Sequence, residues 1–320
     1  MIRLFKACEP SPEELVDPPA DWTLPADTVW LDLVSPSRTE ELAIERALRR
    51  PVPTPAEMAE IEASSRLYRQ DDATYLTTDL LYNTDALLPL TGPVTFILSD
   101  GPLVTVRYFE PRAFKILSEK FDRDPALCEG SLMVLLHLFE AIIDRMADVV
   151  ERLSREVESV SDDIFAAPGK TNYAGAIKQL GTAQLASSRV ADSLTGIERA
   201  LSFVQLDERF AQNEKAREHQ RSLVRDIQSL QSHTAGLGQA VNFQLSAALG
   251  LINIEQSAII KIFSVAAVAF MPPTLIASIY GMNFEHMPEL AQMWGYPAAL
   301  LAMIISALFP LWFFKKRRWL

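Results

Sequence analysis

The strongest pattern along the chain is a pair of uncharged apolar segments near its C-terminal end. No Asp, Glu, Lys or Arg occurs from Ile262 to Phe284, and none occurs from Leu290 to Phe314. A helix crosses a bilayer core of roughly 30 Å with about 20 apolar residues, so each segment is long enough to span a membrane. We therefore predict two spanning helices, the first beginning near Ser257, joined by a short polar loop at one membrane face.

A basic tail, Lys315 to Arg318, directly follows the second apolar segment, whereas the loop around residues 280–290 has no Lys or Arg. Basic residues near the ends of spans favour the cytoplasmic side. The tail and the large region before the first span are therefore predicted to be cytoplasmic, and the loop is predicted to be outside. This topology describes a multi-pass protein of the inner (plasma) membrane with both termini in the cytoplasm.

Before the spans, the spacing of apolar residues is typical of long amphipathic helices. Apolar residues recur at steps of three and four from Leu132 to Ile164, which places them on one helix face. A second helix is predicted from about Tyr173 to Val204 and a third from about Asn213. Because no proline lies between Pro168 and Pro272, the third helix can continue into the first span as a rod on the order of 100 Å long. Such a rod cannot bury its apolar face alone, so we predict self-association.

The N-terminal region shows the shorter periods of a mixed α/β domain. Runs of β-branched and apolar residues predict strands, and Ser99-Asp100-Gly101 between two such runs predicts a hairpin. The spacing of Ser37 and Glu40 predicts a capping box that opens a helix. The predicted strands are 28–34, 74–82, 93–98 and 102–108, and the predicted helices are 37–49, a short one from 56, and 110–121.

These patterns predict a fold of class α+β, in which a cytoplasmic domain is followed by a long helical stalk and two C-terminal transmembrane helices. The predicted parts are the α/β domain at residues 1–125, the long helices and stalk at 126–256, the two-helix transmembrane domain at 257–314 with an outer loop at 281–296, and the basic tail at 315–320.

Composition narrows the classes of function. The chain has 320 residues and a formal net charge of −11, which argues against a nucleic-acid surface because such a surface needs clustered Lys and Arg. Cys8 and Cys128 form no CxxC motif and suit a reduced compartment, and the N-terminus lacks the pattern of a secretory signal. The four histidines are scattered, at 137, 219, 233 and 286, and no P-loop or hydrolase motif is present, so we do not expect an enzyme.

A distinctive motif lies between the two spans. Tyr280-Gly281-Met282-Asn283 ends the first span, and Met287-Pro288-Glu289-Leu290 follows. In this position, with a Lys/Arg-rich end after the second span, the motif resembles that of the CorA family of divalent-cation channels. Elsewhere the similarity is looser, in the helical pattern and in Trp30-Leu31-Asp32-Leu33. The resemblance implies a funnel-shaped homo-oligomer, a pentamer, that passes Mg²⁺.

The resemblance also implies that Gly281, Met282 and Asn283 form the selectivity filter, where Asn283 contacts the hydrated ion and Gly281 permits a turn. Mg²⁺ demands octahedral oxygen geometry and gives up its water reluctantly. A ring of neutral side-chain carbonyls can therefore hold the hydrated ion without binding it too tightly to release. The alternative is that Asn283 only ends a helix, as Asn often does.

Acidic residues surround the predicted outer mouth. Glu285 and Glu289 give the loop a negative charge, which raises the local cation concentration without direct ligation. His286 departs from the aromatic residue expected in the family at this position. One His per subunit, with no second His at i+3 or i+4, is poor support for a zinc site, so we interpret His286 as a loop residue.

Counting back from the filter, the resemblance implies apolar constrictions at Phe263 and Met271 and a polar step at Thr274. Large apolar rings can close a pore by dewetting. The family has a single proline after the Met, whereas Pro272-Pro273 here removes two backbone donors and frees carbonyls that can face the pore or bend the helix. Steps of three and four place one predicted pore face on residues Phe263, Ala267, Met271, Thr274 and Ser278.

Regulation is less well defined by the sequence. In the family, intracellular Mg²⁺ bound by acidic residues between subunits holds the channel shut. The position of such an interface Asp on the third helix is Ser222 by ungapped counting, and Asp226 is one turn further on. Asp162 and Asp163, at the end of the first long helix, are the other candidates. Most acidic residues on such helices are simply solvated.

The leading hypothesis is a homo-oligomeric Mg²⁺ channel that also passes Co²⁺ or Ni²⁺ and needs no cofactor. Its expected partners are other copies of the chain, the lipid bilayer and divalent cations, and not nucleic acid. The closest alternative is a Zn²⁺ transporter of the ZntB branch, with coupling to protons. A further alternative is a membrane-anchored helical scaffold that conducts no ions, which explains the stalk but not the acidic mouth.

Overall fold

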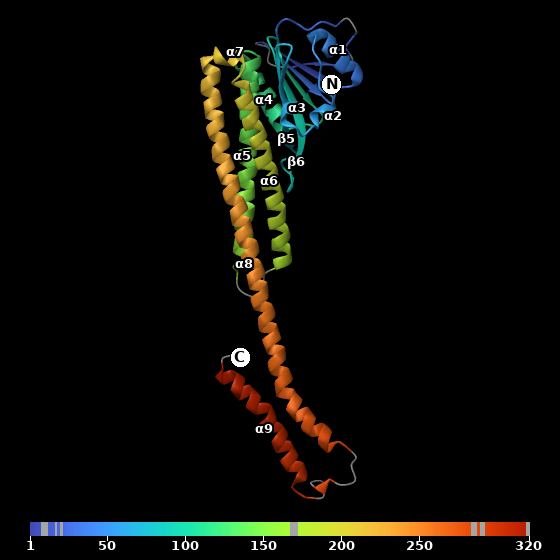
Figure 1. Ribbon diagram of the computed structural model, residues 1–320, viewed down its shortest axis with the longest axis vertical. Helices are drawn as coiled ribbons and strands as arrows, with labels where there is room; N and C mark the ends of the chain where they lie inside the picture. The colour runs from blue at the N-terminus through green and yellow to red at the C-terminus, as the bar shows by residue number, and fades with distance from the viewer. Residues whose placement is uncertain are drawn as a thin grey trace. The chain divides into compact units, whose positions relative to one another are not determined.

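The structure is a computed structural model that describes residues 1–7, 12–16, 18–19, 22–166, 172–282, 287–288 and 292–317. Contacts divide the chain into two compact units, Met1–Leu245 (unit 1) and Ser246–Leu320 (unit 2). Unit 1 contains a sheet and packed helices, and unit 2 contains two apolar helical segments (Figure 1). The predicted borders at residues 125, 256 and 314 stay predictions.

The sheet of unit 1 has seven strands in the order β2-β1-β3-β7-β6-β5-β4. Neighbouring strands are antiparallel, except that β3 and β7 are parallel. The sheet therefore consists of two antiparallel halves joined by one parallel pair. The strands are β1 (Ile2–Lys6), β2 (Glu13–Leu15), β3 (Thr28–Val34), β4 (Leu67–Gln70), β5 (Ala73–Tyr82), β6 (Leu90–Leu98) and β7 (Leu103–Arg107).

The strands predicted from apolar runs are confirmed as β3, β5, β6 and β7, and Ser99-Asp100-Gly101 lies in the connection between the antiparallel β6 and β7. The predictions omitted β1, β2 and β4. The two edge strands, with sequences EEL and LYRQ, are short and polar, as sheet edges commonly are. No apolar run marks such strands in the sequence.

Helices of unit 1 begin where the sequence offers caps. The hydroxyl of Ser37 accepts from the backbone N–H of Glu40 at 3.2 Å, and the Glu40 carboxylate accepts from the backbone N–H of Ser37 at 2.8 Å, which confirms the predicted capping box. The helices are α1 (Arg38–Leu48), α2 (Pro55–Met58), α3 (Ala63–Arg66), α4 (Arg112–Arg123), the 3₁₀ turn η1 (Pro125–Leu127), α5 (Ser131–Ile164), α6 (Tyr173–Val204), α7 (Glu208–Ala211) and α8 (Glu214–Tyr280).

Both faces of the sheet are covered. Alternate residues of a strand point to opposite faces. Leu31 and Leu33 of β3 belong to a buried cluster with Ile44 of α1. Trp30, on the other face, lies edge-on to Phe121 of α4 with 6.1 Å between ring centroids. Because both faces of β3 are buried, its sequence is a nearly continuous apolar run rather than a strict alternation.

A buried ion pair joins β3 to β7. The Asp32 carboxylate accepts from Nε and Nη2 of Arg107 at 3.0 and 2.8 Å, and both side chains are almost fully buried. Asp32 also accepts from the hydroxyl of Thr105 at 2.7 Å, and that hydroxyl accepts from the indole N–H of Trp30 at 3.0 Å. Nη1 of Arg107 donates to the backbone oxygen of Phe109 at 2.8 Å. These hydrogen bonds offset part of the cost of removing the two charges from water.

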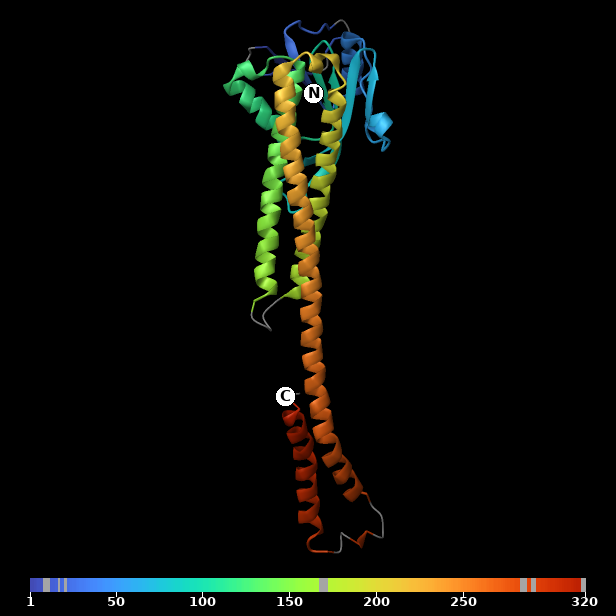
Figure 2. The ribbon, with the colours of Figure 1, turned by 60° about the vertical axis from the view of Figure 1, so that its left-hand side comes forward.

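Helices α5, α6 and the first part of α8 lie side by side (Figures 1 and 2). The apolar stripe predicted between Leu132 and Ile164 is buried, which confirms its interpretation as one helix face. Helix α8 runs from Glu214 through Pro272-Pro273 to Tyr280, which confirms that the third long helix continues into the first apolar segment.

Helix α6 approaches the sheet closely because small residues face strand β5. The hydroxyl of Ser193 donates to the backbone oxygen of Asp79 at 2.6 Å. Gly196, one turn further along, lies directly against the buried side chain of Thr78, so that a Cβ atom at residue 196 would overlap the Thr78 hydroxyl. Because Thr78 is β-branched, its side chain has few rotamers and cannot easily turn away from an added Cβ atom. The absence of a side chain at residue 196 therefore sets the distance between α6 and the sheet.

We expect Gly196→Ala to destabilise unit 1, although Ala is the better helix former. Overpacking a core contact typically costs about 1–3 kcal/mol, whereas the gain in helix propensity is only about 1 kcal/mol. Gly181→Ala on the same helix is the matched control, because no atom lies within 4 Å of a Cβ atom there. In urea unfolding followed by circular dichroism, Gly196→Ala should lower the midpoint and Gly181→Ala should raise it or leave it unchanged. A raised midpoint for Gly196→Ala would contradict this account of the packing.

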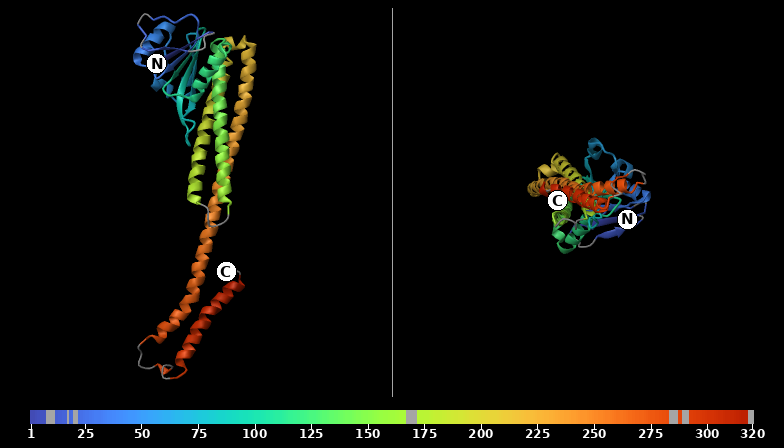
Figure 3. Two further views of the ribbon diagram at one scale, coloured as in Figure 1. Left: turned by 180° about the vertical axis from the view of Figure 1, so that it is seen from behind. Right: turned by 90° about the horizontal axis from the view of Figure 1, so that it is seen from below.

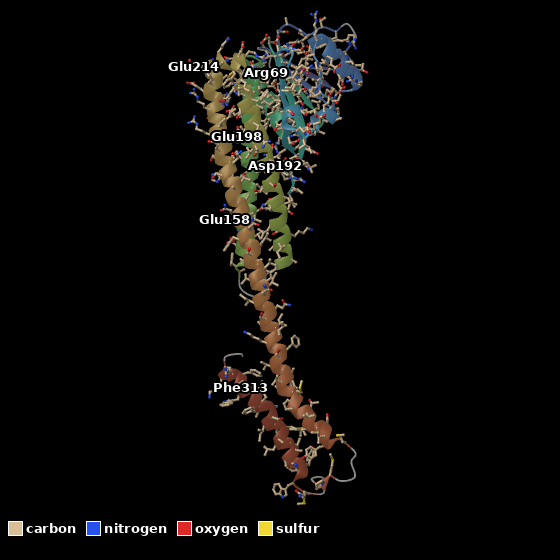
Figure 4. All side chains as sticks on the ribbon, viewed as in Figure 1. Arg69, Glu158, Asp192, Glu198, Glu214 and Phe313 are labelled. Carbon is tan, nitrogen blue, oxygen red and sulfur yellow. The ribbon has the colours of Figure 1, made fainter. Side chains whose placement is uncertain are left out.

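Unit 2 contains the end of α8 and helix α9 (Gly295–Lys316), which runs back beside it (Figure 3). Both helices contain segments long and apolar enough to cross a membrane. The side chains drawn on unit 2, such as Phe313, are mainly carbon, whereas oxygen and nitrogen atoms cover unit 1 (Figure 4). Large exposed apolar surfaces of this kind mark contacts with lipid or with other protein chains.

Candidate functional site

All five residues of the predicted pore face lie on the exposed surface of α8, namely Phe263, Ala267, Met271, Thr274 and Ser278. Val265 and Ala269 of the same span are buried, and so is Ala299 of the neighbouring α9. Val265 follows Phe263 by two residues, and Ala269 follows Ala267 by two. Two residues correspond to about 200° of rotation around a helix. The predicted pore face is therefore opposite to the buried face, and it is left uncovered by α9.

The predicted filter begins where α8 ends. The backbone N–H of Gly281 donates to the carbonyl of Ala277 at 2.9 Å, and a Cβ atom at residue 281 would lie 3.1 Å from that same oxygen. A side chain at this residue would therefore require a small local shift of the helix end, and the role of Gly281 in a filter stays a prediction. Met282 is about half exposed. The other residues predicted at the mouth, Asn283, Glu285, His286 and Glu289, lie outside the residues that the structure describes.

The double proline does not end α8. Because Pro272 and Pro273 have no backbone N–H, the carbonyls of Val268 and Ala269 lack their usual helical donors. At the next residue, the hydroxyl of Thr274 donates to the carbonyl of Phe270 at 2.8 Å. The span therefore presents two backbone oxygens without a helical partner, close to the predicted constriction at Met271.

The candidate regulatory residues do not come together within one chain. Asp162 and Asp163 are exposed at the end of α5, and Asp226 is exposed on α8. Partial burial is the main cause of the raised pKa of Asp144 on α5, and the charges of Glu140, Asp148 and, least of all, Asp226 raise it further, so Asp226 is within electrostatic range of Asp144. Asp144 and Asp162 are eighteen residues apart on one helix, which corresponds to about 27 Å.

A cluster that the sequence analysis missed lies between α5 and α8. His137 and Glu140 are on α5, and His219 is near the start of α8. Nδ1 of His137 lies 3.3 Å from Oε2 of Glu140, and Nε2 of His219 lies 3.6 Å from the same oxygen. The two imidazole centroids are 4.9 Å apart. Two of the histidines that are scattered along the sequence are therefore neighbours in the fold.

The electrostatics of this cluster favour an ionised carboxylate. The hydrogen bond from His137 and then that from His219 hold the pKa of Glu140 well below its usual range, and Lys120 adds a smaller effect in the same direction. The side chains of His137 and His219 are 17% and 16% exposed, and that of Glu140 is 39% exposed, so water and ions have access. The sequence shows only that His137 and Glu140 are three residues apart, which makes them neighbours on one helix face. It does not show that His219 joins them.

Comparison with known proteins gives one consistent result. A family model described as CorA-like Mg²⁺ transporter protein matches residues 25–316. The chain is 39% identical over 293 residues to the magnesium transport protein CorA of Pasteurella multocida, covering 91% of this chain and 92% of the relative. It is 38% identical over 297 residues to the protein of the same name from Escherichia coli K12, covering 92% of each.

A solved structure shares the fold. The complete CorA magnesium transporter of Methanocaldococcus jannaschii superposes with a TM-score of 0.78 at 16% identity, covering 100% of this chain and 98% of the other. The predicted class, an α+β domain followed by a long helix and two C-terminal apolar helices, is thereby confirmed. The family is one of membrane transport proteins, so the expectation that the chain is not an enzyme is also confirmed. With a family model over most of its length and relatives at this level of identity, the chain belongs to the CorA family.

Proposed function

We propose that copies of this chain assemble around α8 into a channel that carries Mg²⁺ across the inner membrane. The observation that carries the proposal is the uncovered predicted pore face of α8, from Phe263 to Ser278, on a helix whose last residue, Tyr280, directly precedes Gly281. The relatives from P. multocida and E. coli are named magnesium transport proteins, which supports Mg²⁺ as the cargo. Co²⁺ and Ni²⁺ are proposed as further cargo because they are divalent ions that also form octahedral complexes.

In this proposal the filter selects a hydrated ion. Side-chain carbonyls of Asn283 from several subunits accept hydrogen bonds from the water shell of Mg²⁺, which keeps most of its water in proteins. Glu285 and Glu289 raise the cation concentration at the mouth through their field. Because the ion is held through its water, it can leave without the cost of full dehydration.

The lower part of the pore face supplies the gate. Rings of Phe263 and Met271 form apolar constrictions that exclude water when the subunits approach one another. Thr274 and Ser278 offer hydroxyls between the constriction and the filter. The loss of the usual helical donors to Val268 and Ala269 lowers the cost of bending this stretch of α8.

Assembly and topology follow from the same helices. Residues that α9 leaves exposed on α8 can be buried only by lipid or by other copies, and we propose a pentamer, as the resemblance implies. The ammonium of Lys316 lies 5.3 Å from the ring centroid of Trp312, and Arg317 lies over Phe313. Aromatic and basic residues at the end of a span are typical of the cytoplasmic interface. Both termini are therefore proposed to be cytoplasmic.

We also propose that intracellular Mg²⁺ closes the channel by binding carboxylates between subunits. Asp226, Asp162 and Asp163 are the candidates, and all three are exposed in the single chain and so accessible to a neighbouring subunit. Replacing each with Asn should raise the internal Mg²⁺ concentration needed for closure. Unchanged inhibition in all three variants would exclude these residues from the regulatory site.

The experiment that tests the function is uptake into liposomes that contain the purified protein. We expect Mg²⁺ entry that follows the membrane potential and ignores a proton gradient, and slower entry of Co²⁺ and Ni²⁺. Zn²⁺ entry enhanced by protons, with little Mg²⁺ flux, would instead establish the ZntB-like alternative. Absence of flux for every ion, from correctly assembled protein, would leave a helical scaffold without conduction.

A further inference from the structure

We propose that His137, Glu140 and His219 form a binding site for a transition-metal ion of the Zn²⁺ class, which ties α5 to the start of α8. The site lies in unit 1 and is separate from the predicted pore residues. It does not depend on which ion the membrane part conducts.

The first argument is geometric. Three potential ligand atoms, one from each residue, all lie within 4.8 Å of one another. In a tetrahedral site with bonds of 2.0–2.1 Å, neighbouring ligand atoms are about 3.3–3.4 Å apart. The separations of 3.3 Å from His137 to Glu140 and 3.6 Å from His219 to Glu140 are close to this value. The nitrogens of the two imidazoles are at most 4.8 Å apart, so rotation of these partly exposed side chains can bring all three atoms onto one ion.

The second argument concerns the alternative, a purely hydrogen-bonded trio. Charge-assisted N–H···O bonds are typically about 2.7–2.9 Å long. Both nitrogen-to-oxygen distances here are longer, although each ring points a nitrogen at the same carboxylate oxygen. The arrangement is thus looser than a strong hydrogen bond and suits a shared ion at the centre of the three atoms.

The ligand types define the ion. Imidazole nitrogens suit Zn²⁺, Co²⁺ and Ni²⁺, whereas Mg²⁺ prefers oxygen ligands. Two His and one Glu are a ligand set known for Zn²⁺, in which a water molecule takes the fourth position. Glu140 supplies the one carboxylate of the site, while Lys120 of α4 opposes cation binding. The site should therefore discriminate against the Mg²⁺ that the channel is proposed to carry.

An ion at this site would connect elements that are distant in the chain. His219 is in the second turn of α8, which continues without a break to the filter residue Gly281. A bond through the ion would fix α8 to α5 in rotation and in register. We infer that the occupied site restrains movement of α8 against the rest of unit 1.

The test is Zn²⁺ titration of the full chain in detergent, by calorimetry, in the presence of excess Mg²⁺ that saturates oxygen-only sites. We expect one Zn²⁺ per chain at this site. Loss of a residue that only hydrogen-bonds to a metal ligand typically costs about 10–100-fold in metal affinity. Because His137→Gln and His219→Gln each remove a ligand itself, each should weaken Zn²⁺ binding by at least about 100-fold. Glu140→Gln, which keeps the shape of the side chain, should weaken it as well.

Matched controls separate this site from others. His233→Gln replaces an exposed histidine on the same helix, and Glu218→Gln replaces the residue next to His219 in the sequence. His286→Gln replaces the histidine of the predicted outer loop. All three should bind Zn²⁺ as the unaltered chain does. Replacing Zn²⁺ with Co²⁺ should give the visible absorption of a tetrahedral complex, and that absorption should be lost in His219→Gln. Equal Zn²⁺ affinity in the unaltered chain and in a His137→Gln, His219→Gln double variant would overturn the proposal, as would Mg²⁺ displacing Zn²⁺ at similar concentrations.

Discussion

The Asn283→Ala channel should lose most of its Mg²⁺ flux while still assembling in the membrane. In the proposed filter, alanine at residue 283 removes the side-chain carbonyl that would accept hydrogen bonds from the hydrated ion. Hydrogen bonds that involve a charged partner are worth about 1.5–3 kcal/mol each, and 1.4 kcal/mol is a factor of ten. We therefore expect uptake into liposomes to fall by roughly 10–100-fold at low Mg²⁺, where binding at the mouth limits entry.

The control for this variant is Asn253→Ala, which removes the same side chain from an exposed position on α8 before the first span. It should leave uptake within about twofold of the unaltered channel, the range expected for a surface position. Size-exclusion chromatography should give the same assembly for both variants. Full Mg²⁺ flux through Asn283→Ala would show that this residue only ends the helix, and the filter would have to be sought elsewhere in the loop.

The largest effect on stability is expected from Asp32→Ala. The variant leaves the Arg107 guanidinium buried between sheet and helices without its counter-ion, 4.6 Å from the ring centroid of Phe114. Removing one partner of a buried pair typically costs about 3–5 kcal/mol. For a unit of this size, each kcal/mol lowers the melting temperature by about 2–4 °C, so we expect a fall of roughly 6–20 °C.

Glu151→Ala serves as the control, because Glu151 is an exposed carboxylate that pairs with an exposed arginine, at 4.0 Å from Nη2 of Arg155. Exposed pairs contribute about 0–1 kcal/mol, so the melting temperature should change by no more than roughly 4 °C. The measurement is thermal unfolding followed by near-ultraviolet circular dichroism. Equal shifts for Asp32→Ala and Glu151→Ala would show that burial of the β3–β7 pair carries no special cost.

The features that could be predicted from the sequence are those with a local and repeated signal. The stripe from Leu132 to Ile164, the limits of the helix at Tyr173–Val204 and the uninterrupted α8 all follow from helical periodicity and from the positions of proline. Strand β3 and the capping box at Ser37 were also predicted, because their determinants lie within a few residues. The apolar segments were defined by composition alone.

What could not be predicted depends on contacts between distant parts of the chain. Arg107 pairs with a residue 75 positions earlier, and only the parallel register of β3 and β7 brings the two together. The meeting of His137 with His219 depends on the rotation of two helices about their own axes, which no spacing within either helix reports. For the same reason the sequence suggested acidic candidates for regulation without indicating that the charge of Asp226 acts on Asp144.

The parallel seam between β3 and β7 has a consequence for how the protein is made. The half with β1, β2 and β3 is complete once Val34 has left the ribosome, but its partner β7 begins only at Leu103. Until then β3 presents a free, largely apolar edge, and such edges pair readily with other chains. Its correct partner must also close a long loop, which is a slow step compared with forming a hairpin. Wrong pairing during synthesis should therefore concentrate at β3, before either membrane helix has emerged.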